Sequence, residues 1–135
     1  MTTLYSAQAK ENKIPITERV KTFEDACQVL GIDAIKFEIT GMDSDVGSIA
    51  AYMKLIVIAR ALNEGWKPNW ANSNEYKYVP WFKENGFGLS FVYCAYWFSI
   101  TFVGSRLCFK SRELAEYAGK QFESIYQEYL TIKPE

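Results

Sequence analysis

The side chains able to carry chemistry in this chain are carboxylates, tyrosines, lysines and cysteines, because its 135 residues include no histidine. Histidine is the side chain whose unperturbed pKa lies nearest neutrality, and both Ser-His-Asp and Cys-His catalysis depend on it. Its absence also excludes histidine-ligated zinc and iron, and with them the zinc deaminase site. The carboxylates of Asp43 and Asp45 lie at an expected helix start, which explains them as caps and as partners of the helix dipole. We therefore predict no catalytic residue and no enzymatic activity.

The three cysteines, Cys27, Cys94 and Cys108, lack the spacing of a metal site or a redox motif. They form no CxxC pair, and an odd number leaves one thiol over if two should bond. Both observations favour reduced thiols in a cytosolic protein, packed in its core. We predict no metal site.

The glycines do not form a phosphate-binding loop. No GxxxxGK[ST] or GxGxxG motif occurs in the sequence. Gly86 and Gly88 begin the second spacing, but Phe91 follows where a third glycine belongs, and its ring would keep a phosphate from the backbone. We predict no nucleotide and no other cofactor.

Aromatic residues make up 16% of the chain, and most of them lie between Trp66 and Phe109. A sheet that displays rings beside cations commonly holds single-stranded nucleic acid. This alternative predicts a phosphate-binding set of Lys77, Lys83, Arg106 and Lys110 on the outer face of a sheet. The competing interpretation is that the rings fill a core and that the cations are ordinary surface residues.

A second cluster of rings surrounds Pro68 and Pro80. Exposed aromatic residues of this kind anchor protein partners. The same residues would equally well form a loop folded over the open end of the core, and the sequence leaves both interpretations open. The candidate partner-binding residues are Trp66, Trp70, Trp81 and Phe82.

Capping signals predict three helices. Thr22 and Asp25 match a capping box and Gly31 supplies a stop, so a first helix is expected over 22–30. A second helix over 44–64 is apolar on nearly all sides and should be the central helix of the core. Ser111 caps a closing helix over 111–130.

Residues 76–110 predict an antiparallel meander of three to four strands, with the three helices packed on one face. Asn85-Gly86 suits a two-residue type I′ hairpin turn, and a second strand would begin at Phe87. The apolar face switches between Cys94 and Tyr96, which predicts a bulge or a bend there. Gly104-Ser105 suits a type II′ turn into a strand over 106–110. Residues 87–105 carry no formal charge, but their β-branched and aromatic content indicates sheet and not a membrane span.

Length and composition fit one domain. The chain is 49% hydrophobic and 23% charged, which is typical of a globular α+β domain over 16–135 after a flexible arm over 1–15. A net charge of -1 supplies no general attraction to nucleic acid or to an acidic membrane. No signal peptide is evident at the N-terminus, so we expect a cytoplasmic protein.

Four blocks carry a resemblance to a known group of proteins. They are Lys21–Cys27, Arg60–Trp70, Lys77–Phe82 and Gly104–Phe122. Together they resemble small proteins without assigned activity that phages and mobile elements of gut Bacteroidetes encode. The resemblance implies a genomic context, with the cytoplasm of a host cell as the location, and assigns no functional residue. We expect a non-enzymatic accessory protein that acts through contacts with another protein or through self-association, with single-stranded nucleic-acid binding as the alternative.

Overall fold

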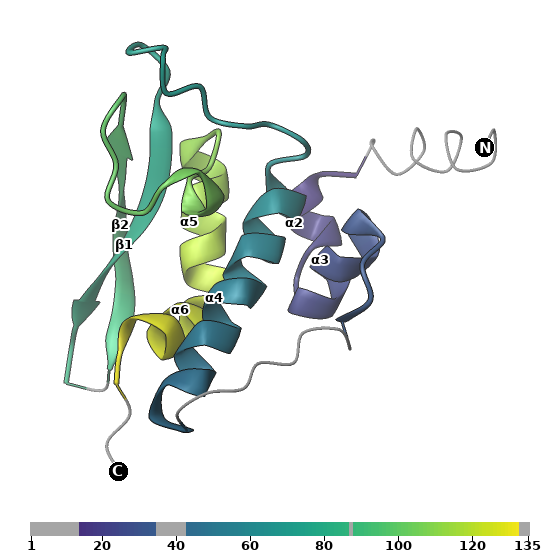
Figure 1. Ribbon diagram of the computed structural model, residues 1–135, viewed down its shortest axis with the longest axis vertical. Helices are drawn as coiled ribbons and strands as arrows, with labels where there is room; N and C mark the ends of the chain where they lie inside the picture. Colours follow the sequence, from purple (N-terminus) through teal and green to yellow (C-terminus); the bar gives the residue numbers. More distant parts are fainter. Residues whose placement is uncertain (1–13, 35–42, 87, 133–135) are drawn as a thin grey trace.

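The computed structural model describes residues 14–34, 43–86 and 88–132, and it combines helices with an antiparallel hairpin (Figure 1). The predicted α+β class is therefore confirmed. Residues 1–13 of the predicted arm lie outside the described residues. In chain order the elements are α2 (Ile16–Arg19), α3 (Phe23–Leu30), α4 (Asp43–Leu62), β1 (Lys77–Glu84), β2 (Leu89–Trp97), the 3-10 helix η2 (Ser105–Leu107), α5 (Arg112–Gln121) and α6 (Glu123–Leu130).

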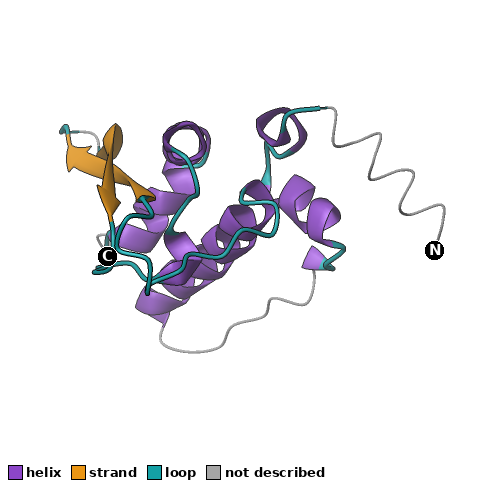
Figure 2. Ribbon diagram, turned by 90° about the horizontal axis from the view of Figure 1, so that it is seen from above, coloured by secondary structure: helices purple, strands orange, loops and turns teal. Residues whose placement is uncertain are grey.

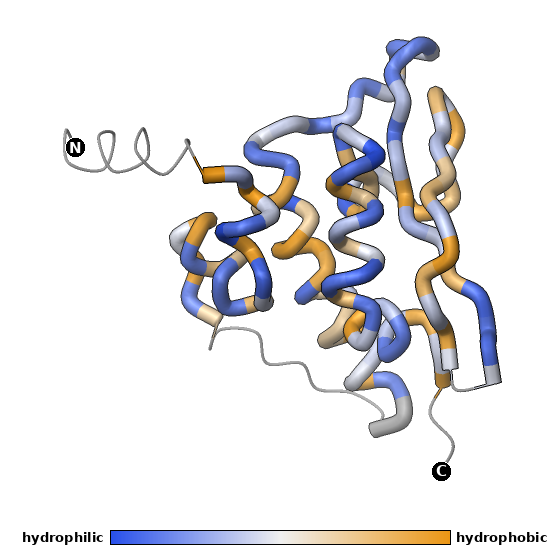
Figure 3. The backbone as a smooth tube through the Cα atoms, turned by 180° about the vertical axis from the view of Figure 1, so that it is seen from behind, coloured by the Kyte–Doolittle hydropathy of each residue, from blue (hydrophilic) through white to orange (hydrophobic). Residues whose placement is uncertain are grey.

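The helices stack in layers on one face of the hairpin (Figures 1 and 2). α5 and α6 lie next to the strands, α4 packs against α6, and α3 packs against α4. Leu55, Ile58 and Leu62 of α4 are fully buried, so α4 is the central helix, as its apolar sequence predicts. Figure 3 shows hydrophobic segments in α4 and in the hairpin, and a hydrophilic loop before β1.

Local capping fixes α3 where the sequence places it. The Asp25 backbone N–H donates to Thr22 Oγ1 at 3.1 Å, and the Thr22 N–H donates to Asp25 Oδ2 at 3.2 Å. Gly31 ends the helix with φ 68°, a left-handed conformation that glycine adopts without strain. The predicted capping box and stop are both confirmed.

The hairpin lies where Asn85-Gly86 predicts it, but its loop is longer than two residues. β1 ends at Glu84 and β2 begins at Leu89, and the Asn85 N–H donates to the Gly88 carbonyl at 3.1 Å. The Glu84 carboxylate accepts the backbone N–H of both Gly86 and Gly88, at 2.6 and 3.2 Å. Asn85 lacks the positive φ that a type I′ turn requires, so the prediction of such a turn at Asn85-Gly86 is wrong. The Glu84 carboxylate contacts hold the turn that forms instead. The predicted strand start at residue 87 lies outside the described residues.

The hairpin contains a bulge, although not at the predicted position. Trp81 pairs with Tyr93, whereas Phe82 pairs with Phe91, so Val92 is the extra residue. Because of this residue, Phe91 and Cys94 both face the helices although they are three positions apart. The switch of the apolar face therefore occurs at Val92 and not between Cys94 and Tyr96.

The predicted meander is wrong, because the described sheet has only the strands β1 and β2. Residues 105–107 form η2, and the segment after it meets β1 in a single bridge between Tyr78 and Phe109. The buried amide of Asn63 takes the place of a strand partner: Nδ2 donates to the Cys108 carbonyl at 2.9 Å, and Oδ1 accepts the Lys110 N–H at 3.0 Å. The turn predicted at Gly104-Ser105 is instead the entry to η2.

The described chain has five α-helices and not three. A short helix, α2, precedes α3, and the predicted closing helix divides in two. Ser111 caps α5 as predicted, because its Oγ accepts the Leu114 N–H at 3.2 Å. The chain then leaves helical geometry at Phe122, with φ -112° and ψ 26°, where the buried ring enters the core. α6 therefore leaves α5 at an angle that lets it pack along α4.

Candidate functional site

The four predicted partner-binding residues do not form one surface. Trp66 is half-buried beside the end of α4, and Trp70 is half-buried over Lys77. Trp81 is 41% exposed on the hairpin. The Phe82 ring lies 4.8 Å from the Tyr126 ring and so packs toward the helices.

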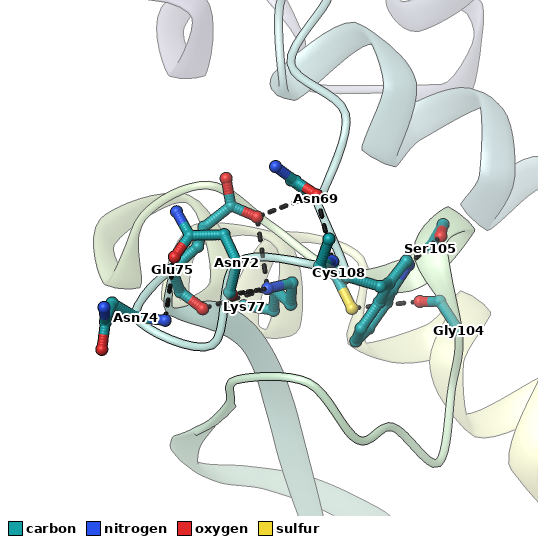
Figure 4. A network of polar contacts seen from close by, with 10 residues as sticks. Asn69, Asn72, Asn74, Glu75, Lys77, Gly104, Ser105 and Cys108 are labelled. Carbon is teal, nitrogen blue, oxygen red and sulfur yellow. Dashed lines mark hydrogen bonds and ion pairs between the residues drawn. The ribbon is translucent and has the colours of Figure 1, made fainter.

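Lys77 is fully buried, with an exposed fraction of 0%. Its ammonium donates to the carbonyls of Asn72, at 3.3 Å, and Glu75, at 3.1 Å (Figure 4). It also pairs with the Glu75 carboxylate at 3.3 Å and lies 5.1 Å from the centre of the Trp70 ring. The loop before β1 thus covers Lys77 on the outer face of the sheet. The ammonium predicted to hold phosphates is therefore not on the protein surface.

The loop over Lys77 is held by further polar contacts. Trp70 Nε1 donates to Ser105 Oγ at 2.6 Å, which ties the loop to η2. The Asn69 N–H donates to the Glu75 carboxylate at 2.7 Å. This hydrogen bond lowers the pKa of Glu75 from its ordinary value, and the contact with Lys77 lowers that pKa further. The cluster of Trp70, Glu75 and Lys77 therefore holds the loop in place.

The other three predicted phosphate-binding residues lie apart. Lys83 is exposed on β1 close to the hairpin turn, and Arg106 is exposed on η2. Lys110 pairs with Glu64 at 3.7 Å. By alternation Lys83 shares the outer face of β1 with Lys77 but lies toward the opposite end of the strand, whereas Arg106 and Lys110 lie outside the sheet.

A groove of about 1140 Å³ lies beside α4 among the described residues. α2, α3, the C-terminal end of α4, the loop at 63–68 and η2 all contribute to its wall. Gly31, which ends α3, and Gly65, in the loop after α4, both lie in the lining and have positive φ. Its cationic residues are Arg19, Arg60, Lys67 and Arg106, and its one acidic residue is Glu64. No sequence motif predicted this groove, because its residues come from five separate segments.

A second candidate surface lies on the hairpin face that points away from the helices. Pro80 and Cys94 face the helices, so the alternation along the strands places Trp81, Tyr93 and Trp97 on the opposite face. The Trp81 and Tyr93 rings stack with centres 6.0 Å apart, and Tyr93 is 55% exposed. Trp97 lines a shallow hollow together with residues of the loop that follows β2. We define the outer apolar surface as Trp81, Tyr93, Trp97, Ile100 and Phe102.

Of the outer apolar surface, only Trp81 is among the residues that the sequence predicted to bind a partner. Ile100 and Phe102 are 70% and 90% exposed, in a loop that the sequence analysis assigned to a strand. The position of Tyr93 on the outer face was not predicted, because the bulge at Val92 shifts the alternation of side chains along β2 by one residue. The sequence signal that could have revealed this surface is the pair of apolar residues, Ile100 and Phe102, that follows β2.

The three cysteines are free and buried, as predicted. Burial raises the pKa of both Cys94 and Cys108 to about 11 and also raises the pKa of Cys27. The Cys108 thiol donates to the Gly104 carbonyl at 3.0 Å. These thiols are therefore protonated at neutral pH in the folded chain.

Comparison of the chain with protein-family models, with curated proteins and with solved structures found no match. Among residues 14–34, 43–86 and 88–132, no three acidic or cysteine side chains gather as ligands for a metal ion. Within the same ranges, no helix has both the length and the apolar composition needed to cross a bilayer.

Proposed function

We propose that this protein is a non-enzymatic accessory protein of a phage or mobile element, and that it acts in the host cytoplasm by associating with its own copies. The observation that carries the proposal is the outer apolar surface. Large apolar side chains exposed together are typical of interaction sites and are uncommon on monomeric proteins. Stacked Trp81 and Tyr93 are residue types that commonly dominate the binding energy of an interface.

The free edge of β2 supports a second copy of the chain as the occupant. Tyr78 exchanges both backbone hydrogen bonds with Phe109, so Tyr96, opposite Tyr78, directs its own backbone groups away from β1. In the described part of the chain, no strand lies beside that edge. An unpaired edge is a template for another strand. Pairing of two β2 strands would give a four-stranded sheet.

Side chains from the helices restrict the pairing to one part of the edge. The Glu123 carboxylate accepts the Phe91 N–H at 2.8 Å, which occupies the edge near the hairpin turn. Arg112 Nη1 donates to the Cys94 carbonyl at 3.5 Å, so only the end of β2 from Tyr96 onward remains for a partner strand. A net charge of -1 gives two copies little mutual repulsion.

Sedimentation equilibrium over a wide range of protein concentration tests the proposal. The wild-type chain is expected to form dimers, and Phe102→Ser is expected to shift the protein toward monomer. Ile132→Ser is the matched control, because Ile132 is 86% exposed but lies outside the outer apolar surface. It should behave like wild type. A wild-type chain that stays monomeric up to its solubility limit would contradict self-association.

Single-stranded nucleic-acid binding is the second candidate, and the exposed Trp81 and Tyr93 rings beside Lys83 favour it. The burial of Lys77 removes one of its expected cations. Titration of a labelled oligonucleotide across a salt series distinguishes the two candidates. Tight binding that Lys83→Ala weakens, by a protein that remains monomeric, would favour this candidate over self-association.

A further inference from the structure

The groove beside α4 combines a positive rim with an apolar floor. Arg60, Lys67 and Arg106 are exposed along it, and Arg19 is half-buried at its α2 side. Glu64, the acidic residue of the lining, already pairs with Lys110 at 3.7 Å. A chain with a net charge of -1 thus concentrates positive charge in this groove, and an anionic ligand is complementary to it.

The floor of the groove identifies the class of anion. Ile16 of α2, Val29 and Leu30 of α3 and Ile56 of α4 supply aliphatic side chains, and Trp66 is the one aromatic residue in the lining. Single-stranded nucleic acid is held mainly by rings on which successive bases stack, and a single ring cannot provide such a platform. Aliphatic floors between helices instead receive the apolar face of an amphipathic helix.

We propose that this groove binds an acidic amphipathic segment of another protein. Apolar side chains of the segment lie on Val29, Leu30 and Ile56. Its carboxylates pair with Arg60, Lys67 and Arg106, and the planar guanidinium of arginine can hold a carboxylate by two hydrogen bonds. The site shares no residue with the outer apolar surface, so the protein can hold a partner and self-associate at the same time.

Fluorescence anisotropy with a synthetic probe tests the groove. The probe is a labelled helical peptide of about 18 residues with leucines at i, i+3, i+4 and i+7 spacing and glutamates on the other face. Binding is expected at low salt and should weaken as salt rises, because exposed charges are screened. The double variant Arg60→Glu/Arg106→Glu should weaken binding by about tenfold or more. Both residues are exposed, so the substitutions should leave the fold intact.

A control variant and altered peptides test the charged and the apolar contacts of the groove separately. A competing oligonucleotide tests nucleic acid as the ligand. Lys83→Glu reverses one charge on β1, outside the groove, which is half the charge change of the double variant, and should leave the affinity unchanged. Peptides with serine for leucine, or lysine for glutamate, should bind at least about tenfold more weakly. The proposal is overturned if the acidic peptide does not bind at low salt, or if Arg60→Glu/Arg106→Glu and Lys83→Glu have equal effects. It is also overturned if a single-stranded oligonucleotide competes for the groove with higher affinity than the peptide. Because sedimentation of the chain alone tests self-association, the two proposals can fail independently.

Discussion

The Lys77 ammonium lies 5.1 Å from the centre of the Trp70 ring, and no part of the lysine side chain reaches solvent. A buried cation is costly unless partners replace its water. Here the replacement comes from two loop carbonyls, one carboxylate and the face of an indole ring. The loop before β1 is therefore ordered by a residue of the strand that it precedes.

Lys77→Met should destabilise the fold by about 1–3 kcal/mol, because it leaves the carbonyls of Asn72 and Glu75 and the Glu75 carboxylate without their buried donor. Methionine keeps the apolar length of the side chain, so loss of packing contributes little. Urea unfolding followed by tryptophan fluorescence measures the change. Lys83→Met, on the exposed part of the same strand, is the matched control and should stay within about 0.5 kcal/mol of wild type. Equal effects of the two substitutions would contradict the structural role of Lys77.

Glu75 should make the stability of the protein depend on pH in the acidic range. The Asn69 N–H and Lys77 lower the pKa of this carboxyl in the folded chain. The resulting stabilisation is present above the unfolded pKa of about 4.3 and is lost as the pH falls through the folded pKa. Glu75→Gln should therefore be less stable than wild type at neutral pH, and the difference should shrink as the pH falls. Urea unfolding at a series of pH values checks this, and parallel curves for the two proteins would contradict it.

Local signals in the sequence predicted the parts of the fold that depend on neighbouring residues. Thr22, Asp25 and Gly31 specify both ends of α3, and Ser111 specifies the start of α5, because each of these contacts spans only a few residues. Asn85-Gly86 located the hairpin for the same reason. The backbone conformation of its turn was not predicted: Asn85 lacks a positive φ, and the Glu84 carboxylate accepts two backbone N–H groups of the turn.

Contacts between distant residues explain the failures. The segment after η2 does not extend the sheet, because the Asn63 side chain, 47 residues before Lys110, takes up its backbone groups. Lys77 appeared to be a surface cation because lysine is almost never fully buried without a partner, and its partners belong to an irregular loop. The groove joins α2, α3, α4 and η2, so no single stretch of sequence could reveal it.

The close approach of α5 to the hairpin depends on Gly119. A Cβ added to this residue would lie 2.8 Å from Pro80 Cβ and would overlap even more with the Phe91 ring, and neither neighbour can move freely within the packed layers. Gly119→Ala should therefore push the helix from the strands and destabilise the fold by about 1–3 kcal/mol, despite the better helix propensity of alanine. Thermal and urea unfolding measure the effect.

Gly47→Ala is the matched control for Gly119→Ala, because Gly47 also lies within a helix, in α4. Its added Cβ would meet only the end of the Glu128 side chain, at 3.0 Å from Oε1, and that flexible group can shift by a few tenths of an ångström. The helix propensity of alanine should then dominate, and the stability should be unchanged or higher by up to about 1 kcal/mol. If both substitutions stabilise the protein, α5 does not lie against the hairpin as closely as described, because the contact with Phe91 and Pro80 leaves no room for a methyl group.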